Sequence, residues 1–383
     1  FDEPWKETTL SALFSKSTQK NADGHITNVI CNSAKLGLIP QREYFDKDIA
    51  NSDNTSGYYI IRQNDFVYNP RKSYDAPYGP IRSYKYAEDG IVSPLYLCFH
   101  AKRKINPMYY EWYFRSSAWH RYIYMSGDSG ARHDRVSIKD DTFFAMPINL
   151  PSEREQSKIA SFLQSLDERI AAQEKLVASL KKYKRGVVDG IFSRKLNFSY
   201  PQTWAELEIS ELFMPISDKG YSDKIVLTIV QGEGTMPRDS VDRRIAYDKS
   251  TISSYKRVLP NDFILHLRSF EGGLEIVNEE GVVSPAYTIL RARNEIIPLF
   301  FYTSFRSYWF INSKLRISVE GIRDGKSINM NTFWHIKVPV PSIEEQRHIS
   351  ALISSIDNRI KIAEFEYKRL LQIRVGLMQQ LFI

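Results

Sequence analysis

Two short loops at matching places in this chain carry side chains that could contact a nucleic acid. An Asn-Asp-Phe motif occurs twice, and the chain continues from it through Arg71 and Lys72 in the first copy and through Arg268 and Ser269 in the second. Arginine donates in pairs to guanine edges, whereas lysine and serine bind phosphate oxygens. The residue types therefore predict that both loops contact DNA.

A second loop is also repeated, and it is rich in basic residues. Its first copy spans Gly130–Arg135 and its second copy spans Gly321–Lys326. The candidate DNA contacts in these loops are Arg132, His133, Arg135, Arg323 and Lys326. The alternative is that Arg132 or Arg323 pairs with the neighbouring Asp134 or Asp324 and only braces the loop.

The segments between the repeated motifs supply further basic residues. Arg243 and Arg244 are the additional DNA-contact candidates, in a stretch that differs between the two halves of the chain. The divergent segments also offer Lys35, Arg42, Arg238, Lys256 and Arg257. For each of these residues, as for Arg243 and Arg244, the favoured alternative is a solvated surface charge. We expect Tyr74, Tyr78 and Tyr84 to pack in the core or in loops rather than to stack on bases.

No catalytic constellation accompanies these loops. The sequence has no G-x-x-x-x-G-K-[ST] phosphate loop, and Gly232-Glu-Gly234 does not continue as a dinucleotide fingerprint. Asn69-Pro70 is followed by Arg71 and not by the Pro-aromatic pair of amino-methyltransferases. The histidines and the two cysteines lack metal-ligand spacing. We therefore expect a binding protein that is not an enzyme and that holds no cofactor or metal of its own.

The loops belong to a chain that contains one long helical segment twice. The first copy starts at Pro151 and the second at Pro341, and they align without a gap for about forty residues. Each copy opens with Pro-Ser-x-x-Glu-Gln, whose Ser and Glu have the capping-box spacing. Apolar residues then alternate by four and three, which is typical of a coiled-coil seam.

Two such helices in one chain predict an antiparallel intrachain coiled coil. At 1.5 Å per residue each helix would be roughly 60 Å long. Polar residues in the seam, Gln173 and the matched pair Lys184 and Arg374, are expected to set the register rather than add stability. The alternative is an ordinary amphipathic core helix in each half of the chain.

A module precedes each helix, and the two modules also match. Trp5–Phe14 parallels Trp204–Phe213, and Gly90–Tyr96 parallels Gly281–Tyr287. Short β-branched and aromatic runs, among them Ile91–Phe99 and Val283–Leu290, predict strands and hence an α+β fold with a twisted sheet in each module. The two copies predict a pseudo-twofold repeat. The predicted divisions are 1–148 and 197–338 for the modules and 149–196 and 339–383 for the helices.

The amino-acid composition gives little support for DNA binding. The net charge is +7, but the modules are nearly balanced and the excess lies in 151–196, where Lys181–Arg185 is more typical of a solvated helix face. No run approaches twenty apolar residues, and the start of the chain lacks a signal-peptide pattern. We expect a soluble protein of the cytoplasm with no membrane partner, its thiols Cys31 and Cys98 reduced.

Two variable modules that alternate with two Pro-Ser-x-x-Glu-Gln helices resemble the specificity subunit of type I restriction-modification systems. The resemblance covers essentially the whole chain, and its most specific parts are Pro151–Ile170 and Pro341–Ile360. One departure is that no helix precedes the first module. The resemblance implies that each module is a target-recognition domain that reads half of a bipartite site on double-stranded DNA.

The resemblance also implies which partners the chain has. The paired helices would set the half-site spacing and bind two modification (methyltransferase) subunits. Those subunits would supply the S-adenosylmethionine chemistry, and restriction subunits would add ATP- and Mg-dependent translocation and cleavage. Two alternatives stay open: a stand-alone methyltransferase or nuclease with an unfamiliar site, and a coiled-coil scaffold whose modules bind protein.

Overall fold

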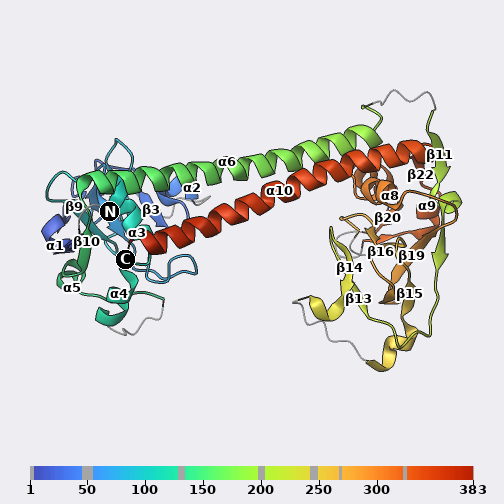
Figure 1. Ribbon diagram of the computed structural model, residues 1–383, viewed down its shortest axis with the longest axis horizontal. Helices are drawn as coiled ribbons and strands as arrows, with labels where there is room; N and C mark the ends of the chain where they lie inside the picture. The colour runs from blue at the N-terminus through green and yellow to red at the C-terminus, as the bar shows by residue number, and fades with distance from the viewer. Residues whose placement is uncertain are drawn as a thin grey trace. The chain divides into compact units, whose positions relative to one another are not determined.

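Two long helices carry the internal repeat in the computed structural model, which describes residues 4–44, 55–127, 134–196, 203–241, 249–266, 270–321 and 326–382. Helix α6 spans Glu153–Phe192 and helix α10 spans Ile343–Leu381 (Figure 1). The two predicted helices are therefore confirmed.

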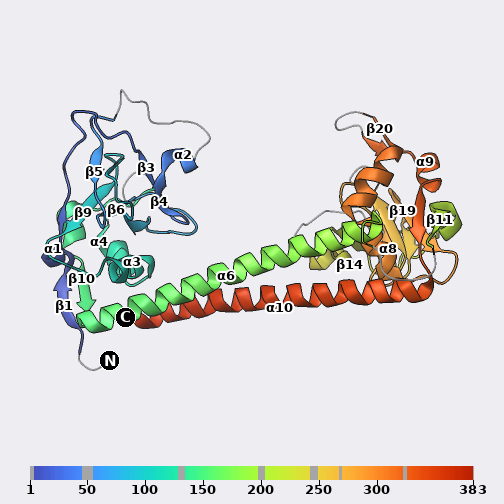
Figure 2. The ribbon, with the colours of Figure 1, turned by 90° about the horizontal axis from the view of Figure 1, so that it is seen from above.

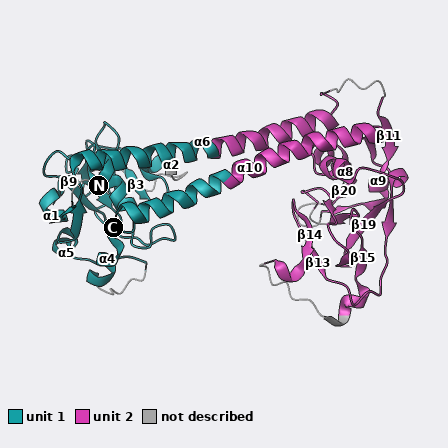
Figure 3. Cartoon of the chain, in the orientation of Figure 1, with its two compact units in different colours: residues 1–173, 366–383 teal, residues 174–365 magenta. Residues whose placement is uncertain are grey.

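The chain divides into two compact units, each of which contains one module and one half of each long helix (Figure 3). Unit 1 comprises residues 1–173 and 366–383, and unit 2 comprises residues 174–365. We describe each unit by itself.

The repeated Pro-Ser-x-x-Glu-Gln motif caps the start of each helix through its serine. Ser152 Oγ accepts from the Glu155 amide, and Ser342 Oγ accepts from the Glu345 amide, each at 3.3 Å. The predicted reciprocal bond from the glutamate is formed in neither described copy: Glu155 Oε1 has no hydrogen-bond partner, and Glu345 Oε1 accepts from Trp204 Nε1 at 2.8 Å. The carboxylate thus ties the helix to its module.

The glutamine of the motif fixes the turn that enters each helix. Gln156 Nε2 donates to the Pro151 carbonyl and Gln346 Nε2 donates to the Pro341 carbonyl, both at 3.0 Å. In unit 2 the same Gln346 side chain also accepts from the Ile297 amide at 3.0 Å. A buried amide that bonds to the backbone in this way explains why the motif contains glutamine in both copies.

Within unit 1 the two helices run antiparallel. Asp167 Oδ1 accepts from Arg374 Nη1 at 2.8 Å, and Arg169 contacts Glu366 at 3.5 Å. The partner's number falls as the residue number rises, which defines the direction. The buried seam residues here are Leu166, Ile170 and Leu370.

Within unit 2 the pairing uses the same residues of the repeat with the roles exchanged. Lys184 Nζ donates to Asp357 Oδ1 at 2.6 Å, as Arg374 does to Asp167 in unit 1. Lys181 adds an ion pair to Glu364 at 2.6 Å. The predicted antiparallel coiled coil is confirmed, and an equivalent ion pair fixes its register in each unit.

Each module is built on a four-stranded antiparallel sheet with the same strand order. In unit 1 the order is β2 (Phe14–Lys16), β9 (Leu97–Ala101), β6 (Phe66–Tyr68), β7 (Ile81–Ser83). In unit 2 it is β12 (Phe213–Ile216), β19 (Tyr287–Ala292), β16 (Phe263–His266), β17 (Glu275–Ile276). Since the order is identical, the modules share one α+β topology.

Three two-stranded ribbons accompany each sheet, again in matching places. In unit 1 they are β1 (Lys6–Thr9) with β10 (Pro147–Leu150), β3 (Ile30–Ser33) with β4 (Gly37–Pro40), and β5 (Tyr59–Ile61) with β8 (Gly90–Val92). In unit 2 they are β11 (Ala205–Glu208) with β22 (Lys337–Val340), β13 (Leu227–Val230) with β14 (Gly234–Pro237), and β15 (Lys256–Val258) with β18 (Gly281–Val283). Unit 2 also has the hairpin of β20 (Val319–Glu320) and β21 (Ser327–Ile328).

Two strands predicted as single runs are each divided. Ile91–Phe99 forms β8 and β9, and Val283–Leu290 contains the end of β18 and the start of β19. Pro94 and Pro285 lie at the breaks. A proline lacks the amide donor that a central strand needs, so the Ser-Pro pair turns the chain between two strands.

The helices of the modules are short. In unit 1 they are α1 (Leu10–Leu13), α2 (Gln41–Tyr44), α3 (Pro107–Arg115), α4 (His120–Ser126) and α5 (Asp140–Phe144). In unit 2 they are α7 (Ile209–Leu212), α8 (Pro298–Phe305) and α9 (Met330–Trp334), with a π-helical turn at Phe310–Lys314 and 3-10 turns at Arg238–Ser240, Lys249–Ser254 and Leu315–Ser318. Figure 2 shows α3 between the helix pair and the strands of unit 1.

The repeated Asn-Asp-Phe motif forms the turn before β6 and before β16. Asn64 and Asn261 have positive φ values of 71° and 73°, a conformation that asparagine tolerates better than most residues. Asp65 and Asp262 then accept a backbone amide three residues earlier, at 2.8 Å in both copies. The motif is therefore structural, and it sets where the following loop begins.

Each long helix contributes side chains to the cores of both modules. The start of the helix packs in the core of the module that precedes it, and its end packs in the core of the other module. In unit 1 the buried core contains Leu163 from the start of α6 and Phe382 from the end of the chain. In unit 2 it contains Ile353 from the start of α10 and Phe192 from the end of α6. This arrangement accounts for the matched phenylalanine at the end of both repeats.

Candidate nucleic-acid interface

The structure brings the two predicted basic loops of the first module together. Arg71 and Arg135 form an isolated antiparallel bridge. The Lys72 amide donates to the Asp134 carbonyl at 2.8 Å, and the Val136 amide donates to the Pro70 carbonyl at 2.9 Å. The loop that follows β6 and the end of the second loop therefore lie side by side.

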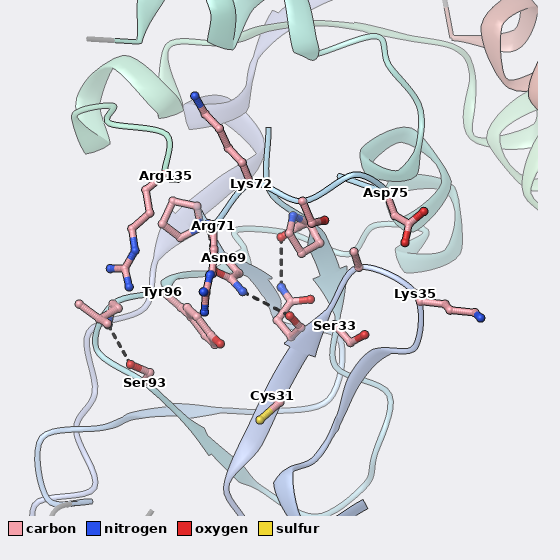
Figure 4. Close-up of a pocket in the computed structure, with 16 residues that line it drawn as sticks. Cys31, Ser33, Lys35, Asn69, Arg71, Lys72, Asp75, Ser93, Tyr96 and Arg135 are labelled. Carbon is pink, nitrogen blue, oxygen red and sulfur yellow. Dashed lines mark hydrogen bonds between the residues drawn. The ribbon is translucent and has the colours of Figure 1, made fainter. Parts of the chain in front are cut away.

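These loops form one wall of an open cleft of about 630 Å³. The opposite wall is the turn of the β3–β4 hairpin, with Ser33, Ala34 and Lys35. Tyr96, Ser93 and Cys31 complete the lining. Figure 4 shows Arg71 and Arg135 extending in the same direction, toward Ser93 and Tyr96, whereas Lys72 and Lys35 extend away from them.

A buried asparagine holds the two walls together. Asn32 of β3 is 6% exposed, and its Nδ2 donates to the carbonyls of Val67 at 2.8 Å and Pro80 at 3.1 Å. In return Asn69 Nδ2 donates to the Asn32 carbonyl at 3.3 Å. These bonds fix the hairpin against the end of β6, and the Pro80 carbonyl also accepts from the Asn69 amide at 3.0 Å.

A glycine permits the tight loop that supports Asn69. Gly79 has a φ of +82°, and a Cβ atom at this position would lie 2.1 Å from the Asn69 carbonyl oxygen. Any other residue would therefore displace the backbone next to Arg71. The loop returns to the sheet through Pro80, directly before β7.

Positive charge dominates the cleft. Arg71, Lys72 and Lys35 are exposed. No ion pair among the described residues engages the Arg71 or Lys72 side chain, and Arg135 approaches its neighbour Asp134 only at 4.0 Å. The alternative role of Arg132 and Arg323 as loop braces lies outside the described residues. Cations without partners at the mouth of a cleft are what phosphate and guanine contacts require.

Asp75 is the carboxylate that lines the cleft with these cations, whereas the thiol and the phenol of the lining stay neutral near pH 7. Burial raises the pKa of the Cys31 thiol and of the Tyr96 phenol. Burial also raises the pKa of the Cys98 thiol, behind the cleft in β9, to about 12. Neither group adds negative charge that would offset the arginines.

Several predicted contact residues lie outside the described residues. In the first module these are Arg132 and His133. In the second module they are Arg268, Ser269, Arg323, Arg243 and Arg244. Lys326 is described: it is exposed at the base of the β20–β21 hairpin, whose intervening loop is the second copy of the repeated basic loop. As a DNA contact it stays a prediction.

The three tyrosines near the first loop behave differently from one another. Tyr84 is fully buried, as predicted, and Tyr78 packs on His120 with ring centroids 4.8 Å apart. Tyr74 is fully exposed, so the prediction that it packs is wrong. It lies in a turn that is closed by mutual hydrogen bonds between Ser73 and Ala76, which leaves its ring in solvent beside Lys72.

Sequence reasoning missed the hairpin wall. β3 and β4 lie in the segment that differs between the two modules, so no repeat marked them. Gly37, with a φ of +80°, is the local signal for a tight turn after Lys35 and Leu36. Leu36 is 58% exposed at the tip of this turn.

Metal-binding clusters and membrane-spanning helices are both absent from the described parts of the chain. No group of three or more His, Cys, Asp or Glu side chains is placed there to hold a metal ion. No described helix has the length and apolar character needed to cross a membrane. Glu275 is buried in unit 2, but it is engaged by the Gly232 amide and the Tyr302 hydroxyl, both at 3.0 Å, and by Arg306.

Comparison with known protein families identifies a match over both halves of the chain. The model of the type I restriction modification DNA specificity domain matches residues 11–182 and again residues 201–372. Each match spans one module and most of the helix that follows it. The repeat unit inferred from the sequence is thus the unit of the family.

Individual relatives agree with this match. The chain is 22% identical, over 302 residues, to a protein of Methanocaldococcus jannaschii described as the type I restriction enzyme MjaX specificity subunit, and the alignment covers 73% of this chain and 68% of that protein. The HsdS subunit of Thermoanaerobacter tengcongensis has a similar fold, with a TM-score of 0.61 and 16% identity over 100% of this chain and 97% of that one. A chain from a structure on the assembly and conformational transition of a type I restriction-modification system gives 0.65 at 15% identity, covering 98% and 97%.

Proposed function

Because this chain belongs to the type I restriction-modification DNA specificity family, we propose that each of its modules reads one half of a bipartite site on double-stranded DNA. The observation that carries the proposal is the cleft of the first module, in which Arg71 and Arg135 lie on adjoining loops. The second module has the same strand order in its four-stranded sheet, so it would read the other half.

In this proposal the chain selects DNA and its partners act on it. Two modification subunits would bind the paired helices and supply S-adenosylmethionine chemistry, and restriction subunits would supply ATP- and Mg-dependent steps. The chain itself would hold no cofactor and would catalyse nothing. Such a complex works in the cytoplasm, on cellular DNA.

The proposal is tested by selecting bound duplexes from a randomised library with the chain and its modification subunits. We expect enrichment of two short sequences separated by a fixed gap. Replacing residues 15–146 with the corresponding segment of another family member should change one of the two sequences and leave the other unchanged. No enrichment with the intact complex, or a change in both halves after the exchange, would contradict the proposal.

The role of the helices as a spacer is tested by lengthening both of them. Inserting seven residues after Gln173 and seven after Ala363 adds two turns to each helix and preserves the seam pattern. Seven residues rise about 10.5 Å, or about three base pairs of DNA. We expect the selected gap to lengthen by about that amount while both half-sites stay the same. An unchanged gap between the half-sites would contradict the idea that the helices set the spacing.

A further inference from the structure

Each module has a largely buried charged side chain at the same position of its edge strand, and the two charges are opposite. Arg82 of β7 is paired with Val67 of β6, and Glu275 of β17 is paired with Ile264 of β16. Val67 and Ile264 each directly follow the Asn-Asp-Phe motif, so Arg82 and Glu275 are equivalent in the repeat. Their side chains are 15% and 6% exposed. A charge with so little access to water needs specific partners.

Both charged side chains bond to the turn of a hairpin in their own module. Arg82 Nη2 donates to the Ala34 carbonyl in the turn between β3 and β4 at 2.5 Å. Glu275 Oε1 accepts from the Gly232 amide in the turn between β13 and β14 at 3.0 Å. The two turns have the same length, because three residues separate the strands in each hairpin. The hairpins can therefore be compared residue by residue.

The two bonds hold the same peptide group of the turn by opposite ends. In the first module this peptide joins Ala34 to Lys35, and in the second it joins Gln231 to Gly232. The carbonyl and the amide of a trans peptide point in opposite directions, so fixing one of them to the edge strand directs the other away from it. The first hairpin thus directs the Lys35 amide away from the strand, and the second directs the Gln231 carbonyl away.

The backbone angles agree with opposite orientations of this peptide. Gly232 has a φ of +92°, as the third residue of a type II turn does, whereas Lys35 at the equivalent position does not have a positive φ, as in a type I turn. These two turn types differ by a flip of the central peptide. No described residue accepts from the Lys35 amide or donates to the Gln231 carbonyl. Each of these groups can therefore bond to a ligand.

The residues that neutralise the two charges differ in a matching way. Glu111 of α3 is buried and lies 4.0 Å from Arg82. In unit 2 the residue equivalent to Glu111 is Tyr302 of α8, whose hydroxyl donates to Glu275 at 3.0 Å. Arg306 neutralises Glu275 in an ion pair. Each buried charge is thus compensated within its own module, and exchanging it requires exchanging its partner as well.

We propose that Arg82 and Glu275 are positioning residues that determine which group the hairpin turn offers to DNA. In the first module that group is the Lys35 amide, which bonds to a phosphate oxygen or to an acceptor on a base. In the second module it is the Gln231 carbonyl, which needs a donor. Phosphates carry no donor, so its partner is the amino group of adenine or cytosine in the major groove. This inference rests on the proposed function, because that function supplies DNA as the ligand.

Exchanging the charges of the second module tests the inference. The double variant Glu275→Arg, Tyr302→Glu gives unit 2 the side chains of unit 1, because Arg115 and Arg306 already match in a repeated Phe-Arg-Ser motif. Glycine adopts both signs of φ, so the turn peptide can flip. In a randomised-site selection with the modification subunits, one position of the second half-site should change from adenine or cytosine to guanine or thymine, which carry an oxygen in place of the amino group. The first half-site should stay unchanged.

A second set of variants tests the first module without leaving a buried charge unpaired. Arg82→Met, Glu111→Gln removes both charges, and the glutamine can still accept from the Ser83 amide, as Glu111 does at 2.6 Å. Affinity for the selected duplex should fall about tenfold, the usual effect of losing a hydrogen bond from a charged group. Arg82→Lys keeps a cation and a donor, so it should retain most of the affinity. Thermal unfolding should show that both variants are folded.

Arg62→Met is the matched control for the first module. Arg62 is an arginine of the same module whose side chain lies 3.5 Å from Asp89 and donates to Gln19 at 2.9 Å, and not to the hairpin turn. Its replacement removes an ion pair without releasing the turn peptide. The affinity and the selected sequence should match those of the wild-type chain.

Three outcomes would overturn the inference: wild-type affinity in Arg82→Met, Glu111→Gln, an equal loss in Arg82→Lys or in the control, or an unchanged base preference in the folded Glu275→Arg, Tyr302→Glu variant. If the exchanged second module does not fold, the variants of the first module decide alone. A wild-type complex that selects no bipartite sequence would instead contradict the proposed function itself. The two failures are therefore distinguishable.

Discussion

Replacing both Arg71 and Arg135 with alanine is expected to lower the affinity for the specific duplex by about 100-fold or more. The two side chains extend from adjoining loops into the same cleft, and the described residues leave them without a close carboxylate. Loss of one arginine that reads a base costs about 1–3 kcal/mol, and tenfold in affinity is about 1.4 kcal/mol. Equilibrium binding by fluorescence anisotropy, at fixed salt, measures the effect.

The way in which DNA binding is weakened distinguishes contacts to bases from contacts to phosphates. If the arginines contact bases, a randomised-site selection with the variant should lose sequence preference in one half-site only. If they contact phosphates, affinity should fall for all duplexes and the dependence on salt should weaken. Unchanged affinity at any salt concentration would show that this cleft is not the DNA site.

Lys85→Ala is the matched control for this variant. Lys85 is an exposed cation of the same module, but it follows the end of β7 that is remote from the cleft, whereas Pro80 and Gly79 precede β7 on the cleft side. We expect its affinity to match that of the wild-type chain. A comparable loss would mean that overall charge, and not the cleft, determines binding.

The parts of the fold that were predictable are those that the repeat marks twice. Positions that match in the two copies identify residues with the same structural role, and the structure shows what that role is. Gln156 and Gln346 each donate to a proline carbonyl. Asn64 and Asn261 each adopt a left-handed backbone conformation in a turn. The period of the seam specified the coiled coil. The antiparallel direction followed from having both helices in one short chain.

The cleft and the exposure of Tyr74 could not be predicted, because they depend on tertiary contacts that the sequence pattern does not reveal. The cleft needs the β3–β4 hairpin, which lies in a divergent segment and is attached by the buried Asn32. Nothing in the local pattern shows that Asn32 would reach Val67 and Pro80. Tyr74 was predicted to pack because tyrosine usually does, yet its turn directs the ring into solvent. Tertiary contacts determined both outcomes.

Phe382→Ala is expected to destabilise unit 1 by about 3–5 kcal/mol, the usual effect of removing a large aromatic side chain from a core. Phe382 is 4% exposed, and its ring centroid is 5.6 Å from that of Tyr109 and 6.0 Å from that of Tyr113. It attaches the end of α10 to the core of the first module. Its loss should therefore loosen the module and the helix together.

Hydrogen exchange followed by mass spectrometry locates the effect. Amides of unit 1 should lose protection while amides of unit 2 change less, and Phe192→Ala should give the reverse, because Phe192 packs on Phe300 in the core of unit 2. Phe365→Ala, on the same helix but 68% exposed, should change stability by no more than about 0.5 kcal/mol. If Phe382→Ala left unit 1 as protected as before, the matched phenylalanines would be remnants of the duplication rather than the attachment of each helix end to its module.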